Sequence, residues 1–182
     1  MTLLVLDLHV PASEAIHSEQ ALGQALLGLA PHLVVYLLGF MTPGIFWVGQ
    51  QTQLNYLARS DRNLAWLHIA FLFVISLMPF STSLMAEFIA YRTALLAYWA
   101  NILLNGTALF VTWRYAMHAG LVRPDVATDI PSHVMRRIVV AQALYAIGAL
   151  LCVFNTYWSS GFIIIVQLNY AIAPRIGILG RI

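Results

Sequence analysis

The chain has no lysine, a single cysteine and few charges of either sign. Its 182 residues include nine arginines and seven acidic residues, and charged residues make up 9% of the total. Soluble domains carry about 25% charged residues, so this composition excludes an ordinary soluble domain. With Cys152 as the one cysteine, an intrachain disulfide and a zinc ribbon are excluded as well. The net charge of +2 gives no reason to expect a nucleic acid partner.

Common catalytic and cofactor-binding motifs are also missing from the sequence. It contains no Walker A loop, no glycine-rich dinucleotide loop, no His-Glu-x-x-His and no Gly-x-Ser-x-Gly. The Thr-Val-Gly-Tyr-Gly filter is absent, which excludes a conventional carbonyl-lined potassium filter. Paired, glycine-broken half-helices are absent too, which argues against a secondary transporter. We therefore expect a membrane protein that is not an enzyme and that has no cofactor or metal.

Long uncharged segments are what the sequence does contain. Hydrophobic residues make up 61% of the chain, and 39 uncharged residues separate Glu19 from Arg59. Uncharged apolar segments of this length indicate membrane-spanning helices. The prediction is an all-α, polytopic membrane helical bundle in one domain, residues 1–182, with a short helical lead-in at 20–30. Its five full spans are expected at 31–56, 63–86, 93–113, 135–154 and 156–174.

The first ten residues form an apolar stretch that ends at Pro11. A span needs about 20 apolar residues, so residues 1–10 are too short to cross a bilayer. We interpret them as the C-terminal half of a sixth helix, the first in the chain, and the sequence as apparently truncated at its N-terminus.

The arginines predict the orientation. If the loop at 11–19 lies outside, eight of the nine arginines fall on the opposite side of the membrane and only Arg92 shares the outer side. This asymmetry satisfies the positive-inside rule and places the C-terminus in the cytoplasm.

Polar residues within the spans leave two interpretations open. His32 and His68 suit a haem ligand or a proton relay, or each makes one interhelical hydrogen bond. The second is favoured, because the expected depths place His32 near the outer face and His68 near the inner face. Gln50 and the i,i+4 pair Asn101 and Asn105 are expected to hold helices together.

Several motifs, in order, resemble the transmembrane protein 175 family of potassium channels. Residues 1–11, Met-Thr-Leu-Leu-Val-Leu-Asp-Leu-His-Val-Pro, are similar to the second half of that family's first helix. The resemblance covers most of residues 1–120. The other matching segments are Pro31 with Tyr36, Phe40-(x)5-Phe46-Trp47, Leu64-Ala-Trp66, Ser76-Leu-Met-Pro-Phe-Ser-Thr82, Tyr98-(x)2-Asn101 and Trp113-Arg-Tyr115.

The resemblance implies a homotetramer with a central pore lined by the first helix, in which K⁺ is the permeant ion. Carried onto this chain, the constriction is formed by the apolar rings of Leu3 and Leu6 beside a layer of Thr2. Val10 continues the stripe of these leucines towards a possible pore mouth, and Asp7, a turn towards the outside from them, is either a ring that concentrates cations there or an ordinary interfacial charge. Leu3 and Leu6 share one helical face, and stacked apolar rings can gate by dewetting. Without the family, the same leucines would be read as facing lipid or another helix. Positions matched as structural are Trp47, Pro79, Phe80, Thr82, Asn101 and Arg114.

The sequence also departs from the family pattern. The Arg-x-x-x-Phe-Ser-Asp motif is absent, Gln50-Gln51 replaces the His-His pair, and His68 stands where the family usually has Asn. The leading hypothesis is a potassium-selective or weakly selective cation channel subunit of a prokaryotic plasma membrane. The alternatives are a non-conducting truncated or divergent protein of the same fold, and a redox or proton-relay protein that uses His32 and His68.

Overall fold

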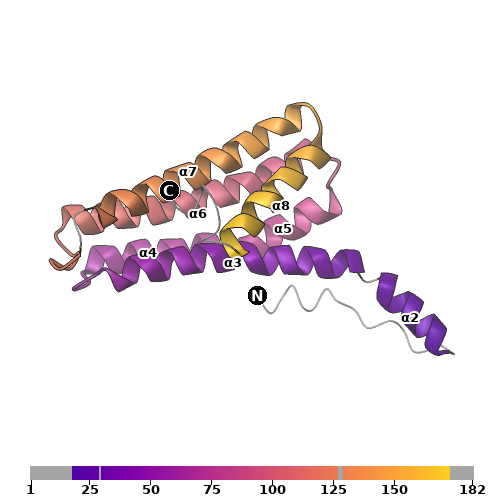
Figure 1. Cartoon of the computed structure of the whole chain (residues 1–182), viewed down its shortest axis with the longest axis horizontal. Coiled ribbons are helices and arrows are strands. Elements are labelled where there is room, and N and C mark those ends of the chain that lie inside the picture. The colour runs from indigo at the N-terminus through magenta and orange to yellow at the C-terminus, as the bar shows by residue number, and fades with distance from the viewer. Residues whose placement is uncertain (1–17, 29, 127–128, 173–182) are drawn as a thin grey trace.

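The computed structural model describes residues 18–172, except residues 29, 127 and 128, and this part of the chain is a bundle of α-helices (Figure 1). The predicted first helix, residues 1–10, lies outside the described residues. The helices are α2 (Glu19–Gly28), α3 (Ala30–Asn55), α4 (Arg62–Ser76), α5 (Met78–Glu87), α6 (Arg92–His118), α7 (Ile130–Leu150), the 3-10 turn η2 (Leu151–Val153) and α8 (Thr156–Ile172).

Three described segments are long and apolar enough to cross a membrane. They are Arg62–Met85, Arg92–His118 and Ile130–Val153. The expected all-α membrane bundle is thereby confirmed. Figure 1 shows α3 and α7 along opposite edges of the bundle, with α6 between them and α8 crossing in front at a slant.

The segment predicted as one span at 63–86 is built from two helices. α4 ends at Ser76, Leu77 caps it, and α5 begins with Pro79 in its first turn. Proline suits a first turn because its fixed φ is helical and the N–H that it lacks would have no intrahelical partner there. The hydroxyls of Ser81 and Thr82 donate to the carbonyl of Met78 and reinforce the new start.

The connections α3–α4 and α6–α7 are tied together at one end of the bundle. Leu57 and Val122 form an isolated antiparallel bridge, and the amide of Arg123 donates to the carbonyl of Tyr56. α6 continues to His118, five residues beyond the end of the span expected at 93–113, so the connection to α7 begins at residue 119. Its turn includes Gly120, whose φ of 63° favours glycine.

Two glycines allow the neighbouring helices α6, α7 and α8 to pack closely. A Cβ on Gly106 of α6 would collide with the side-chain amide of Gln142 on α7, and a Cβ on Gly148 of α7 would lie 2.8 Å from Ile163 of α8. Small residues at such contacts let membrane helices pack closely.

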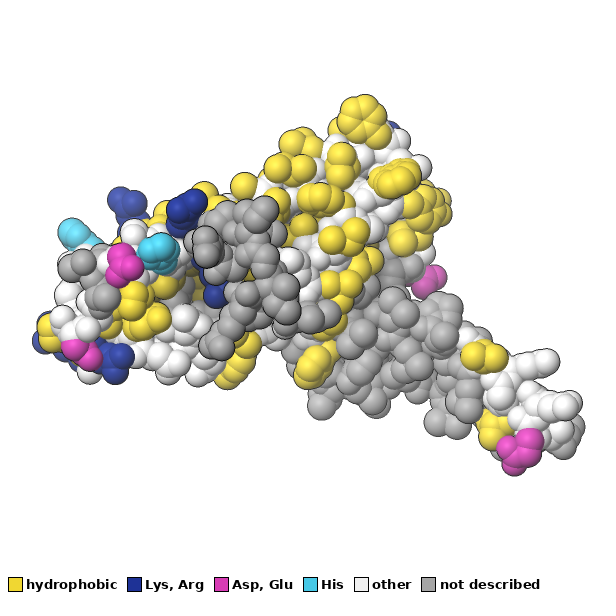
Figure 2. All heavy atoms as spheres, viewed as in Figure 1, with side chains coloured by type: hydrophobic (Ala, Val, Ile, Leu, Met, Phe, Trp, Pro, Cys, Tyr) yellow, Lys and Arg dark blue, Asp and Glu magenta, His cyan; other side chains and the backbone are white. Residues whose placement is uncertain are grey.

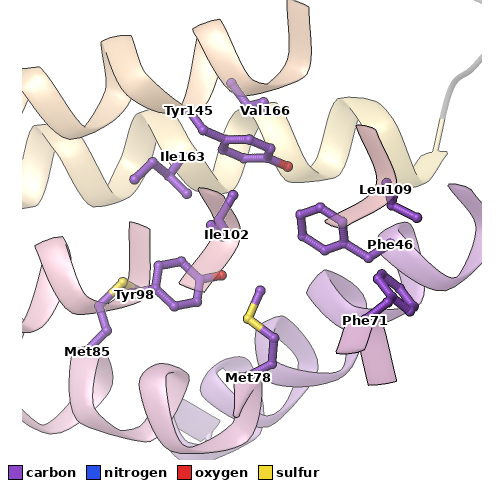
Figure 3. Packing of buried hydrophobic residues seen from close by; sticks show 10 residues of the cluster. All are labelled: Phe46, Phe71, Met78, Met85, Tyr98, Ile102, Leu109, Tyr145, Ile163 and Val166. Atoms are coloured by element: carbon purple, nitrogen blue, oxygen red, sulfur yellow. The ribbon is translucent and has the colours of Figure 1, made fainter. Parts of the chain in front are cut away.

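The largest hydrophobic cluster lies between α3, α4–α5, α6, α7 and α8 (Figure 3). It consists of Phe46, Phe71, Met78, Met85, Tyr98, Ile102, Leu109, Tyr145, Ile163 and Val166. Because α6 packs against α4, α5 and α7, its buried face is at the centre of this core.

Charged side chains concentrate at the end of the bundle that holds the two tied connections. Figure 2 shows arginine, aspartate and histidine gathered there, whereas hydrophobic side chains cover the opposite end over α7 and α8. Exposed apolar residues far from that end, such as Phe154 (86% exposed) and Trp158 (77%), suit contact with lipid.

Candidate functional site

The three residues predicted to line the pore, Thr2, Leu3 and Leu6, lie outside the described residues, as do Asp7 and Val10 at the possible pore mouth. What the structure does describe is the set of polar side chains buried between the helices that follow. In a bilayer core such groups must find partners within the protein. Their pairings therefore show which helices are held in fixed register.

Tyr98 of α6 connects three helices through its hydroxyl. This oxygen lies 2.9 Å from Oγ1 of Thr42 on α3, and it accepts a hydrogen bond of 2.6 Å from Nε2 of Gln167 on α8. All three side chains are almost fully buried. Tyr98 belongs to one of the motifs matched in the sequence, whereas no role was predicted for Thr42 or Gln167. A polar residue within an apolar stretch was the only available signal.

The asparagine pair expected to hold helices together does so through one of its members. Asn101 donates through Nδ2 to Oγ of Ser81 on α5 at 3.0 Å. Asn105 instead donates back to the side chain and carbonyl of Asn101, one turn earlier in the same helix. Asn105 therefore orients Asn101 for its contact with α5.

Gln50 of α3 and His68 of α4 are partners. Nε2 of Gln50 lies 3.0 Å from Nδ1 of His68, so the imidazole nitrogen accepts the amide proton. One turn later, Nε2 of Gln53 donates to the carbonyl of Leu109 on α6 at 3.0 Å. His68 thus makes the single interhelical hydrogen bond that was favoured from the sequence. The side chain of His32 lies outside the described part.

A carboxylate organises the end of the bundle where the connections meet. Oδ1 of Asp61 accepts from the amide of Leu64 and caps α4, while Oδ2 accepts from the hydroxyl of Tyr115 at 2.6 Å. The hydroxyl of Tyr115 also accepts from Asn63. The Tyr115 hydrogen bond, aided by the amide of Leu64, lowers the pKa of Asp61. Sequence reasoning missed this cluster, although an aspartate directly before an apolar helix is a typical N-cap.

Known proteins are similar to this chain over much of its length. The family model of the endosomal/lysosomal potassium channel TMEM175 matches residues 1–79. A potassium channel of Streptomyces collinus is 29% identical over 154 residues, which are 82% of this chain and 70% of that protein. A potassium channel of Chamaesiphon minutus is 24% identical over 176 residues, covering 94% and 86%.

The fold agrees. The crystal structure of a lysosomal potassium-selective channel TMEM175 homolog from Chamaesiphon minutus superposes with a TM-score of 0.75. The match covers 96% of this chain and 90% of that one at 21% identity. The chain is therefore similar to TMEM175 channels in sequence and in fold. The resemblance found in the sequence is confirmed, and the family is one of ion channels rather than enzymes.

The residues matched as structural divide into two groups in this chain. Thr82 and Asn101 are buried, and each makes a hydrogen bond within or between helices. Trp47 and Phe80 are 49% and 68% exposed, and Arg114 is exposed as well. Pro79 lies in the first turn of α5. The buried group accounts for the packing of α4–α5 on α6, and the exposed aromatic residues are open to lipid or to another chain.

Two of the residues that depart from the family pattern are in direct contact. Gln50 and His68 occupy positions where the sequence differs from the pattern, and the structure pairs them directly.

Proposed function

We propose that this chain is the subunit of a passive potassium channel, with K⁺ or a wider set of monovalent cations as the permeant ion. The observation that carries the proposal is the family match over residues 1–79, the part of the chain that contains the predicted pore helix. Two relatives that cover most of this chain are named potassium channels. This function needs neither a catalytic residue nor a cofactor.

The proposed pore lies outside the described bundle. In the family interpretation, Leu3 and Leu6 of each subunit form stacked apolar rings beside Thr2, with Asp7 and Val10 at the outer mouth. The interior of the described bundle supports a pore elsewhere, because it is filled by the hydrophobic cluster and by paired amides and hydroxyls. A homotetramer, with four first helices around an axis, places the pore between subunits.

The exposed apolar surface of α4 and α5 suits such an assembly. Trp66, Ile69, Phe73 and Phe80 are each more than half exposed. The first three recur at spacings of three and four residues, so they share one face of α4. A first helix or a neighbouring subunit that packs on this face would cover it. The proposed location is a prokaryotic plasma membrane, with the arginine-rich end and the C-terminus in the cytoplasm.

The test is potassium flux from liposomes that contain the full chain. Leu3→Ala and Leu6→Ala widen the proposed apolar rings, so we expect faster flux and a lower preference for K⁺ over Na⁺. Thr2→Ala should change the same preference. Leu8→Ala is the matched control, since a helical residue five positions after Leu3 points away from the face that Leu3 and Leu6 share.

Wild-type flux that all three pore variants leave unchanged would remove the pore assignment but keep the channel function. Liposomes that release no potassium above the protein-free background would favour the non-conducting alternative.

A further inference from the structure

A cleft of about 810 Å³ lies between α3 and α7. Gly106 and Leu109 of α6 contribute to its lining, as does Tyr170 near the end of α8. Sites for small ligands in proteins usually measure about 300–1,000 Å³, so the cleft is large enough for the glycerol backbone and upper acyl chain of a lipid.

The cleft is amphipathic. Its walls are mostly apolar, with Phe40, Ile45 and Val48 on α3 and Val134, Ile138 and Ala141 on α7. Two basic side chains, Arg137 and His133, complete the α7 side, and none of the described residues that line the cleft is acidic. The site therefore combines an apolar channel with a positive charge.

Arg137 is the permanent charge of this site. It makes no ion pair within the described part of the chain, and its guanidinium carbon lies 6.0 Å from the ring centre of Tyr170. His133 has a carboxylate beside it, with Nε2 3.6 Å from Oδ2 of Asp129. Arg137 lies seven residues into α7, about 10 Å along the helix at 1.5 Å per residue. That depth suits a side chain that extends along the helix to a lipid phosphate.

Two residues that line the cleft carry buried polar atoms without partners in the described part of the chain. Gln53 and Tyr145 both line it and are each only 2% exposed, yet Oε1 of Gln53 and the hydroxyl of Tyr145 have no hydrogen-bond partner among the described residues. In Figure 3 the hydroxyl of Tyr145 points toward Leu109 and Phe46. Unpaired buried polar groups are costly, so they point to an occupant that supplies polar atoms at this depth.

We propose that the cleft binds one anionic phospholipid of the leaflet at the arginine-rich end. Its phosphate lies at Arg137, its glycerol and ester oxygens lie near Tyr145 and Gln53, and an acyl chain follows the apolar walls of α3 and α7. Basic pockets between membrane helices on the cytoplasmic side are sites of this kind. An unpaired arginine beside an apolar channel complements an anionic amphiphile, and the site is independent of whether the chain conducts.

Native mass spectrometry of the purified full chain tests the charge. Phosphatidylglycerol and phosphatidylcholine with identical acyl chains are titrated separately, and we expect phosphatidylglycerol to occupy one site per chain more tightly. Arg137→Gln should weaken that binding about fivefold, the effect of one basic residue near a lipid surface, and Arg137→Lys should largely restore it. Arg136→Gln is the matched control, because Arg136 is exposed and adjacent but lies outside this cleft.

A second pair of variants tests the cleft itself. Gly44 lines it, and a Cβ there meets nothing within 4 Å, so Gly44→Leu adds a side chain to the channel from a position with room for its first carbon. We expect this variant to lose the tight phosphatidylglycerol site. Gly161→Leu on α8 is the control, since Gly161 is equally open but lies away from the cleft.

Three results overturn the proposal. They are equal affinity for the two lipids, equal loss in Arg136→Gln and Arg137→Gln, and normal binding in Gly44→Leu. If Gly44→Leu changes only the oligomeric state, a second copy fills the cleft and the lipid assignment is wrong.

Discussion

The amide of Gln50 on α3 and the imidazole of His68 on α4 lie 3.0 Å apart, from Nε2 to Nδ1. Each of the two residues departs from the family pattern, and each is the other's partner. The pair joins α3 and α4 directly. We therefore expect the two side chains to have coupled effects on stability.

A double-mutant cycle measures this coupling. Gln50→Ala and His68→Ala each remove the hydrogen bond, and the double variant should be less destabilised than the sum of the two, by about 0.6 kcal/mol and at most about 1.7 kcal/mol for a bond between membrane helices. Unfolding in detergent can be followed by thiol labelling, because the single cysteine, Cys152, is buried. Strict additivity would show that the pair contributes nothing to stability.

Removal of the Tyr98 hydroxyl should destabilise the bundle. Tyr98→Phe leaves Gln167 without its acceptor and takes a partner from Thr42. An unpaired buried polar group costs about 1–3 kcal/mol, and about 1 kcal/mol lowers the midpoint of a protein of this size by roughly 2–4 °C. The measurement is the thermal midpoint from labelling of Cys152. Tyr157→Phe is the control, since Tyr157 is 59% exposed and should change the midpoint little; an equal shift in both variants would contradict the role given to Tyr98.

The contact between α6 and α7 should be intolerant of a single methyl group. Gly106→Ala places a Cβ against the side-chain amide of Gln142, so Gln142 must move from its position on α6. Overpacking of this kind costs about 1–3 kcal/mol. Gly161→Ala, where a Cβ meets nothing, should instead stabilise α8 by up to about 1 kcal/mol. Opposite signs of the two midpoint shifts are the expected result, and a stabilised Gly106→Ala would refute the close approach.

The Asp61 cluster predicts a pH dependence of stability. The hydrogen bond from Tyr115 and the amide of Leu64 lower the folded-state pKa of Asp61 below an unfolded value of about 3.9. The stabilisation is therefore fully present above the unfolded pKa and is lost as pH falls through the folded pKa. Tyr115→Phe should weaken this acid dependence while leaving the N-cap in place. Thermal midpoints of both proteins between neutral and acidic pH check this, and parallel profiles would contradict it.

Much of the helix architecture could be predicted from charge and hydropathy alone. Uncharged segments between Arg92 and Arg114, or between Arg62 and Glu87, indicate helices because a bilayer leaves the backbone no other way to pair its polar groups. The residues at which the helices end could not be predicted in the same way. α6 continues four residues past Arg114 to His118 because its last turn packs Ala116 against Leu64 and Leu121.

The break at Leu77 illustrates another limit. Pro79 was matched to the family as a structural position, without a prediction of what it does to the helix. In the structure it occupies the first turn of α5, where a proline costs no hydrogen bond. A proline in an apolar segment is compatible with a kink, a break or a new start, and only the packing of α5 on α6 selects among them.

Composition, segment length and motif order were enough to predict an α-helical membrane protein that resembles the TMEM175 family, because they are local properties of the chain. The tertiary structure decided which polar residues meet: Gln50 with His68, Gln167 and Thr42 with Tyr98, and Asp61 with Tyr115. Such pairs join residues that lie 18 to 69 positions apart. Their contact depends on the register and rotation of whole helices, which burial of the shared core sets and no local pattern records.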